Sequence, residues 1–129
     1  MQEAPHHTTQ LPKILVVDDR QENLFAMATV LKQLDAEVVT ALSGNEALSH
    51  VLHHSFALIL MDVQMPDMDG LEATKQILAG HPEICIAITS MNKDAQYARL
   101  ADEVGAIGFI PKPDLKGKAL MELMAPRTS

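Results

Sequence analysis

Polar side chains follow several apolar runs of this 129-residue chain, at the point where each run ends. Asp18 and Asp19 end the run 14–17, and Asp62 ends the run 57–61. Thr89 and Lys112 follow two later runs in the same way. If these runs are strands of one parallel sheet, their carboxyl ends meet at a single edge, which is where such folds bind ligands. We therefore expect the five side chains to converge on one site.

The chemistry of such a site follows from its charges. Three carboxylates that converge repel one another, and a hard divalent cation such as Mg²⁺, which prefers oxygen ligands, relieves that repulsion. Lys112 adds an ammonium that can pair with a carboxylate or a phosphoryl oxygen, and Thr89 adds a hydroxyl donor. A carboxylate nucleophile, a divalent metal, an ammonium and a hydroxyl are the parts needed to transfer a phosphoryl group to an aspartate.

The apolar spacing predicts strands and helices in strict alternation. We expect strands at 13–17, 37–41, 57–61, 84–88 and 107–110, and helices at 23–34, 44–54, 71–78, 94–104 and 114–125. Five strand–helix repeats predict an α/β fold with a parallel sheet and helices on both of its faces. Ser43 and Glu46 form a capping box for the second helix, which we expect to turn Leu48, Val51 and Leu52 inward.

Length and composition narrow the class of protein. The chain is long enough for one domain, which we place at 12–126, with a flexible segment at 1–11 and a tail at 127–129. The net charge of -7 argues against non-specific binding to nucleic acid or to acidic membranes. No apolar run reaches the ~18 residues that span a bilayer, and the first ten residues contain no apolar segment of the kind that signal peptides have, so we expect no signal peptide there. A single cysteine, Cys85, fits a reducing compartment, so we expect a cytoplasmic location.

Four segments together resemble a known signature. They are Val17-Asp18-Asp19, Met61-Asp62-Val63-Gln64-Met65-Pro66-Asp67-Met68-Asp69-Gly70, Ile88-Thr89-Ser90 and Ile110-Pro111-Lys112-Pro113. In this order and at strand ends, they resemble the receiver domains of two-component response regulators over about residues 13–125. The form Asp-Val-Gln-Met-Pro is similar to receivers of hybrid histidine kinases and multi-domain regulators. The resemblance implies the flavodoxin-like doubly wound (βα)5 fold, with a five-stranded parallel sheet in the order 2-1-3-4-5.

The resemblance also implies a role for each residue of the site. Asp62 would be the phosphoacceptor, and Lys112 and Thr89 would contact the phosphoryl group. The Mg²⁺ cofactor would be bound by the side chains of Asp19 and Asp62, by Asp18 either directly or through a water molecule, and by the backbone carbonyl of Gln64. Thr89 and Phe109 would form the conformational switch, although Phe109 lacks the hydroxyl of the tyrosine often found there.

Partners are implied in the same way. The phosphoryl donor would be a phosphohistidine of a histidine kinase or of a histidine phosphotransfer protein. An output domain would belong to a longer chain, and a homodimer would use the face formed by 94–104, 107–110 and 114–125. Such a domain is a signalling switch and not a turnover enzyme, and it contacts neither nucleic acid nor membrane directly.

Four other readings compete with this one. A receiver-like interaction scaffold would never accept phosphate. A phosphatase of the haloacid-dehalogenase type needs a second aspartate two residues after the nucleophile, where this chain has Gln64. A nucleotide-binding module needs a glycine-rich loop after the first strand, and none is present. His50, His53 and His54 suggest a metal site, but one solvated helix face explains them more simply.

Overall fold

A parallel five-stranded sheet forms the centre of the molecule, as the sequence predicts. The computed structural model describes residues 11–65, 68–91, 95–115 and 122. The strands are β1 (Lys13–Val17), β2 (Glu37–Ala41), β3 (Leu58–Asp62), β4 (Ile86–Ser90) and β5 (Gly108–Pro111). The helices are α2 (Gln21–Lys32), α3 (Gly44–His53), α4 (Gly70–Gly80) and α5 (Gln96–Glu103), followed by the 3₁₀ turn η1 (Lys112–Asp114). The strand order is β2-β1-β3-β4-β5, which confirms the predicted topology.

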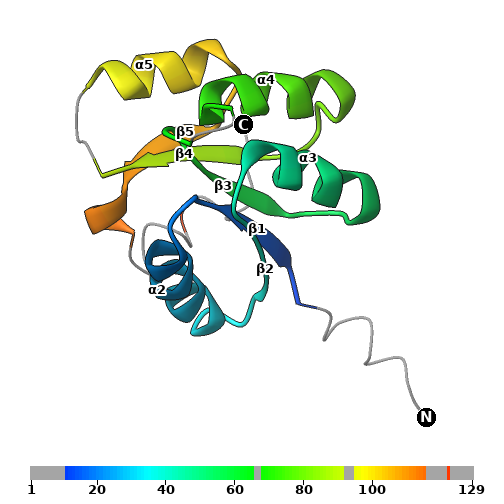
Figure 1. Cartoon of the computed structure of the whole chain (residues 1–129), viewed down its shortest axis with the longest axis vertical. Helices are drawn as coiled ribbons and strands as arrows, with labels where there is room; N and C mark the ends of the chain where they lie inside the picture. Colours follow the sequence, from blue (N-terminus) through cyan, green and yellow to red (C-terminus); the bar gives the residue numbers. More distant parts are fainter. Residues whose placement is uncertain (1–10, 66–67, 92–94, 116–121, 123–129) are drawn as a thin grey trace.

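The two faces of the sheet have separate cores. Figure 1 shows α2 on one face and α3, α4 and α5 on the other. Alternate residues of β1 and β3 point to opposite faces because a strand has a two-residue side-chain period. One set, which includes Leu60, packs with residues of α2. The other set, which includes Ile59, packs with residues of α3, α4 and α5. The three central strands β1, β3 and β4 are therefore buried almost along their full length.

Local sequence signals set two of the helix starts. Ser43 caps α3, its hydroxyl accepting the backbone N–H of Glu46 at 3.1 Å. The Glu46 carboxylate accepts the N–H of Leu42, one residue before the position that a capping box requires. Asp69 caps α4 in the same manner, through the backbone N–H of Glu72 at 2.8 Å. A side-chain cap of this kind is worth about 1 kcal/mol.

Gly70 fixes α4 against the strand that carries Asp62. Its N–H donates to the Val63 carbonyl at 2.7 Å. A Cβ atom at this position would lie 2.0 Å from the backbone oxygen of Asp62. Only glycine fits such an approach, so the first residue of α4 lies directly against the end of β3.

Several predicted boundaries and one predicted core residue are wrong. Strand β4 begins and ends two residues later than the predicted range 84–88 and so includes Thr89 and Ser90, while α5 is shorter at both ends. Leu52 is 73% exposed and not inward, because it lies on the solvent side of α3. The predicted helix 114–125 falls mostly outside the described residues, as do the predicted flexible segment up to residue 10 and the tail 127–129.

Candidate active site

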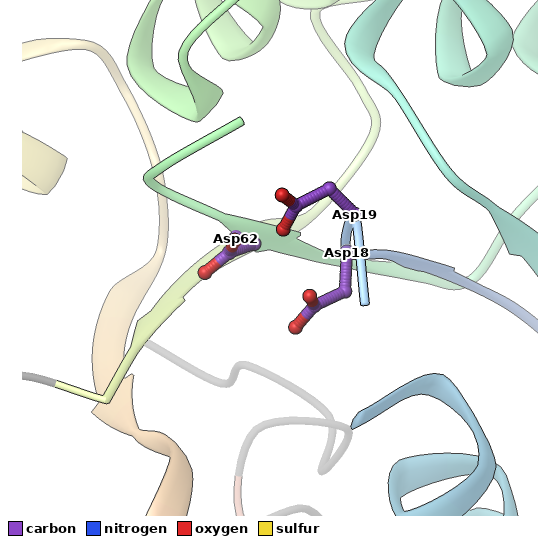
Figure 2. A group of neighbouring side chains, drawn as sticks. All are labelled: Asp18, Asp19 and Asp62. Atoms are coloured by element: carbon purple, nitrogen blue, oxygen red, sulfur yellow. The ribbon is translucent and has the colours of Figure 1, made fainter. Parts of the chain in front are cut away.

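Three aspartates meet at the carboxyl edge of the sheet. Asp18 and Asp19 directly follow β1, and Asp62 is the last residue of β3. Carboxylate oxygens of all three lie within 4.8 Å of one another, and Figure 2 shows the three side chains grouped in this way. Asp18 and Asp62 are buried, whereas Asp19 is exposed. Adjacent parallel strands thus bring together the aspartates that the sequence places 43 residues apart.

Lys112 supplies the positive charge of this cluster. The turn η1 follows β5 and carries the Lys112 ammonium to 2.5 Å from Asp18 Oδ2 and 3.0 Å from Asp62 Oδ1. The lysine side chain is 10% exposed, so the ion pairs are largely shielded from water. The other oxygen of Asp18 accepts the backbone N–H of Arg20 at 3.0 Å and lies 3.4 Å from the Asn23 amide. Asp18 is thereby held in place from two elements.

Asp62 is the electrostatically unusual residue of the site. Burial away from water, together with the negative charges of Asp18 and Asp19, raises its pKa to about 6. The Lys112 ammonium acts in the opposite direction but does not compensate fully. The ionised form of Asp62 is therefore stabilised by a bound cation, and a covalent modification that removes its negative charge also removes the free-energy cost of burying that charge.

Thr89 faces this cluster with an unused hydroxyl. It lies opposite Asp62 in the register of β3 and β4 and is fully buried. Its Oγ1 has no hydrogen-bond partner among the described residues. An unpaired buried hydroxyl costs free energy, so this position suits a ligand that brings an oxygen acceptor. Ser90, the next residue, is also buried.

The donor set of the edge fits Mg²⁺. Asp18, Asp19 and Asp62 are the one group of three potential metal ligands found in the described part of the chain. All their donors are carboxylate oxygens, which hard divalent cations prefer. Gln64, whose backbone carbonyl was the fourth predicted ligand, is exposed beside Asp19 on the wall of a hollow of about 550 Å³.

An outer hollow lies beside the buried cluster. It is lined by one residue of the acidic cluster, four residues of the β3–α4 loop and one residue of α5, namely Asp19, Val63, Gln64, Met65, Asp69 and Tyr97. Sequence reasoning did not identify Tyr97. The available signal was an aromatic residue in the first turn of the helix after the Thr89 strand.

Phe109 sits apart from the acidic cluster. It is half-buried on β5 and packs with the core under α3, α4 and α5. Its ring centroid lies 5.7 Å from that of Tyr97, with the planes tilted by 38°. The structure therefore joins the predicted switch residue to the outer hollow through Tyr97.

The histidines of the described residues lie at the other end of the molecule. His53, His54 and His81 line a hollow of about 490 Å³ between the carboxyl ends of α3 and α4. The Lys13 ammonium lies 3.2 Å from His54 Nδ1, which occupies one potential ligand atom. In the described residues no histidine joins a group of three potential metal ligands, which favours the solvated-face interpretation. None of the described helices is long and apolar enough to cross a membrane.

Comparisons with known proteins agree with this geometry. A family model described as response regulator receiver domain matches residues 14–124. The chain is 43% identical over 80 residues to the sensor protein GacS of Pseudomonas syringae pv. syringae, covering 62% of this chain and 9% of that protein. It is 36% identical over 104 residues to a protein-glutamate methylesterase/protein-glutamine glutaminase of Archaeoglobus fulgidus, covering 79% of this chain and 30% of that protein.

One solved structure illustrates the match of folds. A response regulator receiver domain protein from Clostridium thermocellum superposes with a TM-score of 0.80 at 28% identity, covering 88% of this chain and 91% of that one. The curated relatives are much longer proteins, of which this chain spans less than a third.

Proposed function

Because the chain belongs to the response regulator receiver domain family of two-component signalling, we propose that Asp62 accepts a phosphoryl group from a phosphohistidine. The observation that carries the proposal is the environment of Asp62. A buried carboxylate of raised pKa lies beside a shielded ammonium and opposite a buried hydroxyl that has no hydrogen-bond partner within the described part of the chain. These groups match the charge and the oxygen acceptors of a phosphoryl group.

Each residue has a distinct part in the transfer. A carboxylate oxygen of Asp62 attacks phosphorus, the new O–P bond forms as the N–P bond to the donor imidazole breaks, and the imidazole leaves as the neutral base after taking up a proton. The Lys112 ammonium, already 3.0 Å from Asp62, pairs with a phosphoryl oxygen as negative charge shifts outward. The Thr89 hydroxyl donates to a second phosphoryl oxygen and gains the hydrogen bond that it lacks among the described residues.

Mg²⁺ would be held by Asp18, Asp19 and Asp62, with the Gln64 carbonyl as a further ligand. When bound, it would neutralise the charge of the acidic cluster and of the phosphoryl oxygens. The raised pKa of Asp62 supports this assignment, since the cluster in its ionised form has more negative charge than Lys112 offsets. Hydrogen bonds from Arg20 and Asn23 hold the Asp18 carboxylate in place, so this ligand would already be positioned before the metal binds.

The partners follow from the donor chemistry and from the relatives. We infer that a histidine kinase or a histidine phosphotransfer protein supplies the phosphoryl group. The relatives include a sensor protein and a protein-glutamate methylesterase, and the region that matches this chain is only a part of each, which supports a role within or beside an output domain. Phosphorylation would then shift the Thr89 and Phe109 region between two conformations and so change partner binding, including self-association through the α5 and β5 face.

Intact-mass spectrometry after incubation with acetyl phosphate tests the proposal. We expect a gain of one phosphoryl mass in the wild type with Mg²⁺, and none with EDTA or in Asp62→Asn. Asp102→Asn, which removes an exposed carboxylate of α5, is the matched control and should gain the same mass as the wild type. A wild type that gains no mass from acetyl phosphate or from a phosphohistidine protein would favour the scaffold function instead.

A further inference from the structure

Tyr97 occupies a position between the outer hollow and Phe109. It lies in the first turn of α5 and is half-buried against the core under α3, α4 and α5. It is the only tyrosine of a chain that has no tryptophan. Neither the metal ligands nor the residues that contact the phosphoryl group include it, so the proposed transfer leaves its role open.

One side of Tyr97 lines the hollow beside the acidic cluster. Across this hollow lie Asp19, Gln64 and Met65. The hollow also includes Val63, the residue directly after Asp62, whose backbone N–H donates to the Thr89 carbonyl. If phosphorylation of Asp62 rearranges the β3–α4 loop, the shape of the hollow beside the Tyr97 ring changes with it.

The other side of Tyr97 packs on Phe109. The two rings lie 5.7 Å apart between centroids and are tilted by 38°, a separation within the range of favourable aromatic pairs. Phe109 pairs in register with Ile88, the residue before Thr89. Because Phe109 has no hydroxyl, it reports a change in its surroundings only through the groups packed on it.

We propose that Tyr97 is a positioning residue of the switch, whose ring transmits a change in the hollow at Asp19 and Gln64 to Phe109 and to α5. The proposal rests on the function proposed for Asp62 and adds the path by which that site acts on the rest of the domain. Packed interiors respond to displacement by moving between discrete arrangements. A ring that lines the hollow on one side and packs on Phe109 on the other couples the two, whereas a methyl group at position 97 would leave a gap beside Phe109.

The intrinsic fluorescence of the wild type tests this without any substitution. Since Tyr97 is the only strong emitter in the chain, its emission reports on this position alone. We expect the emission to change when acetyl phosphate and Mg²⁺ phosphorylate the protein, and to stay constant in Asp62→Asn. Unchanged emission in a sample that is phosphorylated by mass would overturn the proposal.

A second test compares the backbone amide chemical-shift changes on phosphorylation in Tyr97 variants and in the wild type. Tyr97→Ala should be phosphorylated by mass but should show at most half of the wild-type shift changes at Phe109 and Ala101. Tyr97→Phe, which keeps the ring, should restore them, and Phe25→Ala, which truncates an aromatic residue that is 77% exposed on α2, should leave them unchanged.

The outcomes separate the two proposals. Full wild-type shift changes in phosphorylated Tyr97→Ala would contradict the role of Tyr97 and leave the function of Asp62 intact. Absence of phosphorylation in the wild type would remove the function and this inference together, and the mass spectrum distinguishes the two cases. If Tyr97→Ala does not fold, Tyr97→Leu replaces it with the same expected loss, and the fluorescence measurement stands independently.

Discussion

The two ends of the central sheet differ in the burial and pairing of their charged side chains. At the carboxyl edge, Asp18 and Asp62 are buried and share a single lysine. At the amino edge, the Lys13 ammonium lies 3.2 Å from His54 Nδ1, and no described acidic residue is buried. Each edge also has a hollow, of about 550 Å³ beside Asp19 and about 490 Å³ beside His54.

The comparison shows which feature marks the functional edge. The two hollows have similar volumes, so size does not separate them. What differs is uncompensated charge, because burying a carboxylate costs free energy unless it is paired. Carboxylates are buried at the carboxyl edge, whereas no described carboxylate is buried at the amino edge. Four sets of substitutions compare the two edges directly.

The two ends of α4 offer the sharpest contrast. Gly70→Ala at the carboxyl edge places a methyl group 2.0 Å from the Asp62 carbonyl oxygen and should lower the free energy of unfolding by about 4 kcal/mol. Gly80→Ala at the amino edge meets no atom within 4 Å and should raise it by up to about 1 kcal/mol. Urea denaturation of both variants measures this. Equal effects would show that α4 does not fix the end of β3.

The lysines of the two edges should also differ. Lys112→Met leaves two buried carboxylates without their cation and should cost about 3 kcal/mol in EDTA. Added Mg²⁺ should recover part of that loss, since it replaces the missing charge. Lys13→Met removes a contact to the His54 ring and should cost less than about 1 kcal/mol, with or without Mg²⁺. A similar cost for both lysines would contradict the contrast between the edges.

The pH dependence of stability should come from the carboxyl edge. Because the pKa of Asp62 is raised to about 6, the folded state holds a proton that the unfolded state has lost between about pH 4 and 6. The metal-free wild type should therefore lose stability as pH rises through this window and stay level above it. Asp62→Asn should remove the slope and be more stable at pH 7 by up to about 3 kcal/mol.

Denaturation of both proteins in EDTA from pH 4 to 7 checks this prediction. Asp35→Asn is the control, because it removes an exposed carboxylate from a turn with positive φ that asparagine also adopts. A slope that persists in Asp62→Asn would assign the titration to another group.

The smallest effect is expected at the amino edge. His54→Gln removes the contact with Lys13 and should change stability by less than about 1 kcal/mol. Its phosphorylation by acetyl phosphate should equal that of the wild type in rate and extent. A slower reaction would mean that the histidine end communicates with Asp62.

The sequence predicted the strand ends well because each apolar run stops at a residue that cannot be buried cheaply. Asp62 and Lys112 were found in this way, and the structure brings them to 3.0 Å. Tyr97 was missed because nothing in the linear pattern tells which helix face meets the β3–α4 loop. Leu52 was misplaced for a related reason, since α3 has more apolar residues than its buried side accommodates.

Amide NMR of the wild type during Mg²⁺ titration, followed by acetyl phosphate, tests the central claim most directly. The claim is that the carboxyl edge, and not the histidine edge, binds the metal and accepts phosphate. We expect saturable shifts at Asp18, Asp19, Asp62 and Gln64 with Mg²⁺, a further change at Thr89 on phosphorylation, and none at His54 or His81. Shifts centred on the histidines, or no saturable change at the aspartates, would contradict the account.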